Sequence, residues 1–282
     1  MWSLYDAELG WLDLNVDNGI MIEEFTPGSP EVRSVLNRRP MAHGFVDETR
    51  YFGERSISMS GKIKATSTKS IEDVSTSLKR YLLPNRRPVL RWTRGDMVRD
   101  ISVRVARPLE QTLMFAVDDF RLELTADTFW RDTTQLQIPV AFSDNVALGG
   151  DPFPWLGGPS ALISFAPGTV AEVVVTNSGD VDVYPLITVY GQVSGVVLRN
   201  LTTGRDFEIG VDVSDGSSAV IDMENHTATL NGLQNVFSLV DFAVSEWWPL
   251  VPGEQSVMFL SPTDPTGPTP PFATFTYSNL RV

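Results

Sequence analysis

The sequence predicts a mainly β protein made of two β-sandwich-like domains, the first with one helix and the second a jelly roll. Three observations lead to this fold class. Short segments that alternate apolar and polar residues recur along the chain, only one segment has helical periodicity, and a Gly- and Pro-rich stretch separates the two halves. A chain of 282 residues also exceeds the usual domain size of roughly 100–200 residues.

The Gly- and Pro-rich stretch sets the expected domain limits. Residues 141–160 lack any apolar periodicity, so we expect them to form a linker. The first domain then covers residues 1–140 and the second covers residues 161–282.

Strands dominate the first domain. Residues 11–15 and 17–22 indicate two short strands around an Asn-Gly turn, whereas residues 29–40 are polar, are bounded by Pro and predict a loop or arm. Residues 56–63 (SISMSGKI) alternate apolar and polar side chains, as in a strand with one wet face. Further strands are expected at residues 88–93, 99–107 and 115–125.

The single helix is expected over residues 71–83. Ser70 occupies the N-cap position with Asp73 three residues later, and Lys79 and Arg80 lie in the last turn before Pro84. The helix has an apolar stripe made of Ile71, Val74, Leu78, Tyr81 and Leu82.

The second domain reads as strand and turn throughout. Residues 183–190 (VYPLITVY) form a nearly unbroken β-branched and aromatic run, which predicts a strand buried on both faces or in a sandwich core. About nine short strands at this spacing favour a jelly-roll sandwich; they are expected at 162–165, 171–176, 183–190, 195–200, 206–211, 219–223, 227–230, 257–260 and 273–277.

The residue types argue against an enzyme and against a bound cofactor. Cys is absent and the only histidines are His43 and His226, which leaves little material for thiolate or zinc chemistry. The hydrolase, phosphate-loop and dinucleotide motifs are missing. Asp212, Asp215 and Asp222 allow a calcium site or a carboxylate pair, but a solvated turn fits residues 212–217 better because the calcium-loop pattern is not met.

Charge is divided unevenly along the chain. The net charge is −13, yet residues 1–140 hold 19 basic and 20 acidic residues whereas residues 141–282 hold 3 and 15. An overall acidic chain is not expected to bind nucleic acid or an anionic membrane. The acidic half either aids solubility or faces outward from an assembly in which the first half packs. With neither a long apolar run nor a signal peptide at residues 1–6, we expect a soluble protein made in a cytoplasm.

Four arginines follow the predicted helix, and they are candidate interface residues: Arg86, Arg87, Arg91 and Arg94. Ion pairs to a neighbouring subunit are one interpretation, and an ordinary solvated face is the other. A nucleic-acid platform is disfavoured, since Trp92 alone supplies an interleaved aromatic ring.

Two adjacent tryptophans, Trp247 and Trp248, are candidate sugar-stacking residues. Neighbouring residues on a strand point to opposite faces, so one ring can lie in the core while the other is exposed. An exposed ring could stack on a sugar or on another subunit, and the alternative is that both rings pack in the core.

The order of these segments resembles the distal tail protein family of long, non-contractile-tailed (siphovirus-type) bacteriophages. In the first half the similarity lies at Phe45, Val46 and Asp47, at residues 55–63 and 78–92, and at 120–130, which ends in DTFW. In the second half it lies at 177–180 (NSGD), 184–191 (YPLITVYG), 198–204 (LRNLTTG), 219–222 (AVID), 227–232 (TATLNG) and 247–253 (WWPLVPG), although Glu254 stands where the family often has Asn or Asp.

The resemblance implies a structural protein of the virion, assembled in the cytoplasm of the host bacterium. Its first domain would form a hexameric ring, called the belt, and its second would be a galectin-like jelly roll. The ring would join the tail-tube protein to a tail-tip or tail-associated protein at the baseplate. The family implies no catalytic residues. The alternative function is a carbohydrate- or receptor-binding tail protein that acts in host adsorption.

Overall fold

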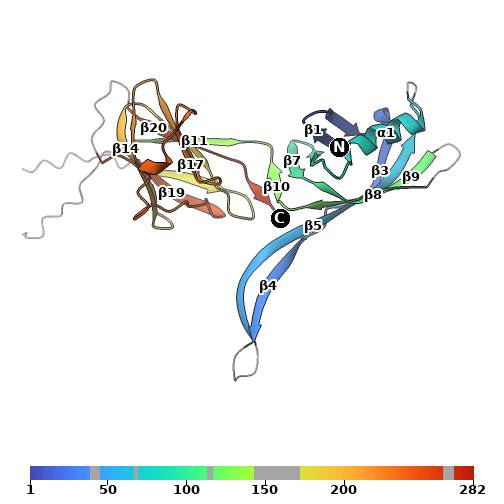
Figure 1. Ribbon diagram of the computed structural model, residues 1–282, viewed down its shortest axis with the longest axis horizontal. Helices are drawn as coiled ribbons and strands as arrows, with labels where there is room; N and C mark the ends of the chain where they lie inside the picture. Colours follow the sequence, from blue (N-terminus) through green and yellow to red (C-terminus); the bar gives the residue numbers. More distant parts are fainter. Residues whose placement is uncertain (39–44, 67–68, 113–116, 143–171, 263–269) are drawn as a thin grey trace, which may run out of the picture. The chain divides into compact units, whose positions relative to one another are not determined.

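The computed structural model describes residues 1–38, 45–66, 69–112, 117–142, 172–262 and 270–282. The chain divides into two compact units (Figure 1): unit 1 contains residues 1–134 and 280–282, and unit 2 contains residues 135–279. Most of the expected linker 141–160 and the expected strand 162–165 lie outside the described residues, so the sequence-based domain limits stay a prediction. The mainly β fold class with a single α-helix among the described residues is confirmed.

Unit 1 is built from two antiparallel sheets. Its first sheet contains the chain's last strand, which explains why residues 280–282 belong to unit 1. In order across the sheet, its strands are β2 (Gly10–Leu14), β1 (Trp2–Asp6), β6 (Val89–Arg94), β7 (Met97–Ser102), β10 (Trp130–Asp132) and β21 (Leu280–Arg281).

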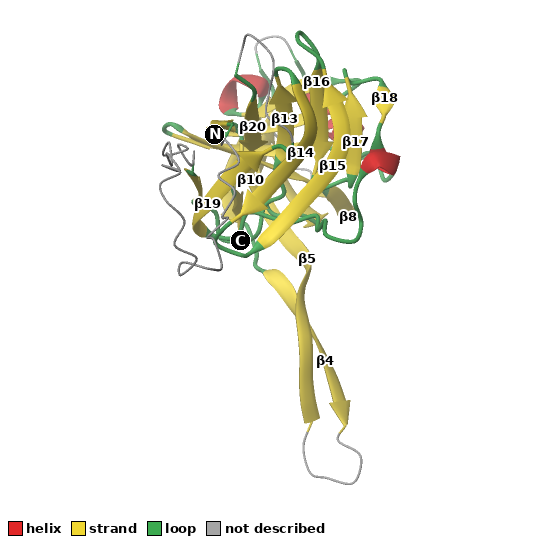
Figure 2. Ribbon diagram, turned by 90° about the vertical axis from the view of Figure 1, so that its left-hand side faces the viewer, coloured by secondary structure: helices red, strands yellow, loops and turns green. Residues whose placement is uncertain are grey.

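The second sheet of unit 1 is organised by one very long strand. β5 (Phe45–Lys64) is 20 residues long, and only its second half, from Arg55 on, pairs with β9. Its first half pairs only with β4, and the two strands leave the sheet as a two-stranded ribbon (Figure 2). The strand order is β3 (Ile20–Thr26), β5, β9 (Val117–Ala126) and β8 (Arg104–Thr112), with β4 (Pro30–Arg38) paired to β5.

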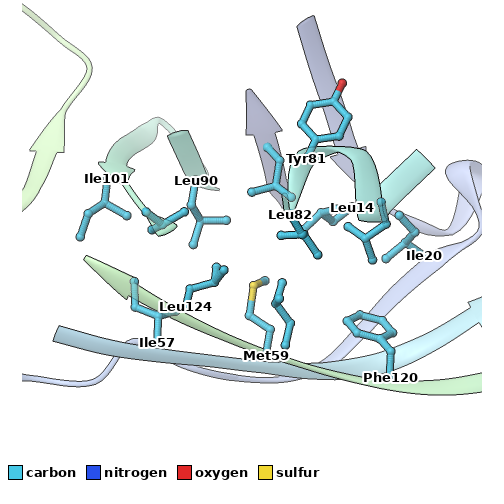
Figure 3. Close-up of a cluster of buried hydrophobic side chains, with 14 of the residues drawn as sticks. Leu14, Ile20, Ile57, Met59, Tyr81, Leu82, Leu90, Ile101, Phe120 and Leu124 are labelled. Carbon is cyan, nitrogen blue, oxygen red and sulfur yellow. The ribbon is translucent and has the colours of Figure 1, made fainter. Parts of the chain in front are cut away.

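Helix α1 (Ile71–Tyr81) closes the core of unit 1. Its N-terminus has a full capping box, in which Asp73 N–H donates to Ser70 Oγ at 3.2 Å and Ser70 N–H donates to Asp73 Oδ2 at 3.0 Å. It ends two residues before the predicted limit, at a C-cap formed by Leu82. The buried side chains of the helix and of both sheets meet in one apolar cluster, shown in part in Figure 3.

Unit 2 contains two antiparallel sheets whose buried side chains alternate along each strand, as in a β-sandwich. The first sheet has the order β11 (Leu136–Ala141), β20 (Phe272–Tyr277), β13 (Leu186–Tyr190), β16 (Ser218–Asp222), β17 (Thr227–Leu230) and β18 (Gln234–Asn235). The second has the order β12 (Val173–Asn177), β19 (Gly253–Leu260), β14 (Val193–Asn200) and β15 (Arg205–Val213).

Of three local predictions, one is wrong and two hold in only one of their alternatives. Residues 29–40 do not form a loop, but most of them form β4 and so belong to the projecting ribbon, which fits the alternative of an arm. The Asn18-Gly19 pair does not close a hairpin, because η1 (Val16–Asn18) intervenes and β2 and β3 belong to different sheets. For the strand within 183–190, burial on both faces is wrong and the alternative of a sandwich strand with one core face holds, because Ile187 and Val189 are buried whereas Leu186 and Tyr190 are exposed.

Candidate assembly interface

The β4–β5 ribbon is the part of unit 1 best placed to contact another chain. Residues Phe45–Glu54 of β5 pair only with β4, so on the N-terminal side of Arg55 the ribbon has no third strand among the described residues. An isolated two-stranded hairpin is only marginally stable in water. A ribbon of this length is therefore expected to gain a partner, either along its free edges or across its faces.

Two apolar side chains near the base of the ribbon are exposed to solvent, among the charged side chains of Glu31, Arg33 and Glu54. Val32 and Phe52 face each other across the two strands and are 58% and 50% exposed. Phe52 has one aromatic contact, an edge-on approach to Phe129 with ring centroids 5.5 Å apart. Exposed apolar side chains on a strand pair are typical of a surface that another protein covers.

Arg55 lies where the ribbon joins the sheet, and its guanidinium is buried. Its exposed fraction is 2%, and its Nε and Nη2 have no hydrogen-bond partner among the described residues. Burial lowers the pKa of Arg55, because removing the charge from water disfavours the protonated form. Such buried donors are rare in folded proteins, and they identify the base of the ribbon as incompletely satisfied in the single chain.

The four predicted interface arginines fall into two pairs. Arg86 and Arg91 bind acidic groups of their own unit. Arg86 bonds Asp6, and it also donates to Glu8 at 2.7 Å. Arg91 forms a two-point contact with Asp100, with both N···O distances at 2.7 Å, and lies 4.1 Å from the centre of the Trp11 ring.

The Asp6–Arg86 pair shifts the pKa values of both partners. Burial acts to raise the pKa of Asp6, but the bonds from Arg86 and from the amides of Glu8 and Leu9 hold that pKa below its ordinary value. Hydrogen bonds to Asp6 and Glu8 raise the pKa of Arg86. Arg86 therefore fixes the β1–β2 turn to the segment that follows α1.

Arg87 and Arg94 are the two that face outward. Arg87 lies 3.9 Å from Asp127, with 69% of its side chain exposed, and Arg94 is exposed at the β6–β7 turn. An interface role for these side chains stays a prediction. The sequence did not separate the two pairs, because the contacts of Arg86 with Asp6 and of Arg91 with Asp100 form only when β1, β6 and β7 pair.

The two tryptophans differ sharply. Trp248 is fully buried against Phe275, so its assignment as a sugar-stacking residue is wrong. Trp247 is half-buried; its ring stacks on His226 with centroids 5.0 Å apart and touches Phe207 at 4.6 Å. Since these neighbours occupy much of its surface, Trp247 is mainly a packing residue.

Of the predicted carboxylates in unit 2, Asp222 caps a turn and Asp212 forms a cross-strand bond. Asp222 accepts from the amides of Glu224 and Asn225 at 2.9 Å each, and Asp212 bonds Ser194. Burial acts to raise the pKa of Asp222, but bonds from Asn225 and Glu224 hold it below its usual value. No group of three His, Asp or Glu residues suited to a metal occurs in the ranges that the structure describes. Within the same ranges, no helix is both long and apolar enough to span a membrane.

Comparison with known proteins gives one family and a set of similar structures. Residues 178–279 match the family model described as siphovirus-type tail component, C-terminal domain. The crystal structure of the SPP1 Dit protein, which its title calls a paradigm of the hub adsorption apparatus in phages infecting Gram-positive bacteria, superposes with a TM-score of 0.67 at 10% identity. The alignment covers 99% of this chain and 100% of that one.

A second similar structure is the phage P2 baseplate in its activated conformation with calcium. It has a TM-score of 0.49 at 10% identity, and the alignment covers 98% of this chain and 97% of that one. No curated protein matches. The family match covers most of unit 2, and the SPP1 Dit similarity shows that unit 1 also has the fold of that chain.

Proposed function

We propose that this protein, whose residues 178–279 match the siphovirus-type tail component family, is the distal tail hub, in which copies of unit 1 form a hexameric ring that joins the tail tube to the tail tip or baseplate. The family match supports a structural role in a phage tail and not an enzymatic one. What we propose beyond this is the number of copies, six, and the two binding partners, a tail-tube protein and a tail-tip protein.

The observation that carries the ring is the β4–β5 ribbon. It extends from the second sheet of unit 1, and among the described residues no further strand pairs with its two strands. A projecting ribbon contacts a different surface on the next copy from the one it comes from. Contacts of this head-to-tail kind generate closed rings when the rotation between copies closes.

One further feature supports assembly through unit 1. Unit 1 carries 20 basic and 20 acidic residues. Copies of an electrically balanced unit can approach one another without net repulsion.

A shortened ribbon tests the proposal. In the variant, residues 33–51 are replaced by Asn-Gly, so that Val32 and Phe52, which already face each other, flank a two-residue turn. Sizing chromatography with multi-angle light scattering should give a ring-sized mass for the full chain and a monomer for the variant.

The control is the fold of the shortened variant, since its circular dichroism and unfolding temperature should match those of the full chain. If the shortened variant kept the oligomer mass of the full chain, the ribbon would not be part of the interface between copies. A full chain that stays monomeric and binds neither tail-tube nor tail-tip proteins would overturn the hub itself.

A further inference from the structure

An apolar patch on unit 2 forms a second interaction surface. Five large apolar side chains are exposed within one short segment, where Leu233 is 92% exposed and Phe242 is 58% exposed. We call these residues the 233–244 patch: Leu233, Phe237, Leu239, Phe242 and Val244. The segment includes η2 (Phe237–Leu239), drawn in red next to β18 in Figure 2.

The patch is held rigidly. Its backbone is fixed to β15, since Asp241 N–H donates to Glu208 O at 3.0 Å and Glu246 N–H donates to Asp206 O at 2.9 Å. Its rings continue into the core: Phe237 lies 5.2 Å from Phe242 and stacks on Trp247, which touches Phe207. Preformed aromatic anchors of this kind lose little conformational entropy on binding.

The surroundings of the patch are acidic. Unit 2 carries 15 acidic residues, and its only basic residues are Arg199 and Arg205. Both are used inside the unit, because Arg199 binds Asp206 at 2.7 Å and Arg205 lies 3.3 Å from Glu246. Asp241 is exposed within the patch segment and accepts from the amide of Ala243 at 3.0 Å. Glu208 lies close enough to Arg199 to help raise the pKa of that arginine.

We propose that the 233–244 patch docks a basic protein segment in which Phe or Leu anchors alternate with Lys or Arg. Charge selects this partner from the other candidates. A second copy of unit 2 and an anionic membrane would both be repelled, and residues 143–171 of the chain itself contain Asp144 and Asp151 but no basic residue. Since the patch lies wholly within unit 2, the same binding is expected for a monomer and for a ring.

Three synthetic peptides of equal length serve as probes. The first contains Phe and Leu anchors with four Lys, the second has Glu in place of Lys, and the third has Ser in place of the anchors. Fluorescence anisotropy with the full chain should show binding of the first peptide only. Replacing Leu239 and Phe242 by Ser should weaken that binding by about tenfold or more, whereas Leu201→Ser, an exposed site in the β14–β15 turn, should leave it unchanged.

Several outcomes would overturn this proposal. Equal binding of the Ser peptide would mean that charge alone acts, and equal binding of the Glu peptide would mean that charge plays no part. Loss of unit 2 stability in the Leu239→Ser, Phe242→Ser variant would show that the chain itself covers the patch. Binding to phosphatidylcholine vesicles, lost in the same variant, would identify a membrane surface instead. The peptide titration is repeated with the shortened-ribbon variant. Binding by this variant would support the patch even if the ring proposal is wrong.

Discussion

Unit 1 and unit 2 share a β architecture but differ in charge balance. Unit 1 carries 20 basic and 20 acidic residues, and its ion pairs link neighbouring strands, as between Arg91 and Asp100. Unit 2 also has a cross-strand pair, Arg199–Asp206, but it carries two arginines against 15 acidic residues, and most of its acidic side chains face solvent. The balanced unit suits contact with copies of itself, whereas the acidic unit suits contact with a basic partner. The predictions that follow test this contrast from the largest expected effect to the smallest.

The largest effect should come from the core of unit 2. Ile187 is fully buried, so Ile187→Ala should lower the free energy of unfolding of unit 2 by about 2–5 kcal/mol. Leu186, its exposed neighbour on β13, is the matched control. Leu186→Ala should change the free energy of unfolding by less than about 1 kcal/mol. Calorimetry should show one displaced transition, with the transition of unit 1 unchanged. Displacement of both transitions would mean that the two units do not unfold independently.

Two glycines give the next test, one beside the ribbon and one in unit 2. Both have positive φ, +60° at Gly28 and +70° at Gly204, but a Cβ at Gly28 would lie 1.9 Å from Ser56 O whereas the space around Gly204 is open. Gly204→Ala should therefore lower stability by about 1–2 kcal/mol, and Gly28→Ala by about 2–5 kcal/mol once the clash is added. Denaturant titration measures both. Equal losses of stability in the two variants would show that β5 can shift at Ser56 and relieve the clash.

How much of this organisation the sequence could predict depends on whether a segment covers a core. The helix was predictable because Ser70 and Asp73 cap it and its apolar stripe is buried. Only residues 56–63 of the long β5 strand were predicted, because they alternate over the core of unit 1. The first half of β5 has no core beneath it, so alternation gave no signal there and β4 was taken for a loop.

The candidate sites were less predictable for a related reason. The partners of Arg86 and Arg91 are brought close only by the pairing of β1, β6 and β7. The 233–244 patch was missed, since its exposed apolar residues follow neither a strand period nor a helix period, and a sequence alone does not show that Phe242 is exposed. The sequence left open whether one or both adjacent tryptophans are buried, and the structure buries Trp248 fully and Trp247 in part.

A smaller effect is expected from the arginines of unit 1. Arg91 binds Asp100 at two points and covers Trp11, so Arg91→Ala should lower stability by about 1 kcal/mol. Arg94→Ala, at an exposed position on the same strand, should leave stability within about 0.5 kcal/mol of the parent. Thermal unfolding measures the change in stability of both variants. The oligomer mass of each variant shows whether the replaced arginine contributes to an interface. If Arg94→Ala destabilised the monomer more than Arg91→Ala, it would be wrong to divide the arginines into those that bind groups of their own unit and those that face outward.

The smallest effect concerns pH. Hydrogen bonds from Ser70 hold the pKa of Asp73 below its ordinary value, and the pKa values of Asp6 and Asp222 are also lowered. A lowered folded-state pKa adds stability that is complete above the unfolded value, roughly 3.9, and is lost as the pH falls through the folded value. These groups should therefore leave stability unchanged between pH 7 and pH 5 and reduce it below about pH 4.

Unit 1 should be the first to respond to acid. It holds two of the three lowered groups, whereas protonation also relieves the repulsion among the acidic residues of unit 2. Calorimetry between pH 5 and pH 3 should move the transition of unit 1 further than that of unit 2. Asp73→Asn should reduce the acid-induced change in the unfolding temperature of unit 1. If that change stayed the same, other carboxylates would be responsible for it.

Electron microscopy of the purified full chain tests the central claim most directly. The hub predicts rings with a central channel and the mass of a hexamer of 31.2 kDa chains, and it predicts that these rings disappear when residues 33–51 are replaced by Asn-Gly. Single particles the size of one chain, together with no such ring at the junction of tube and tip in assembled tails, would contradict the account.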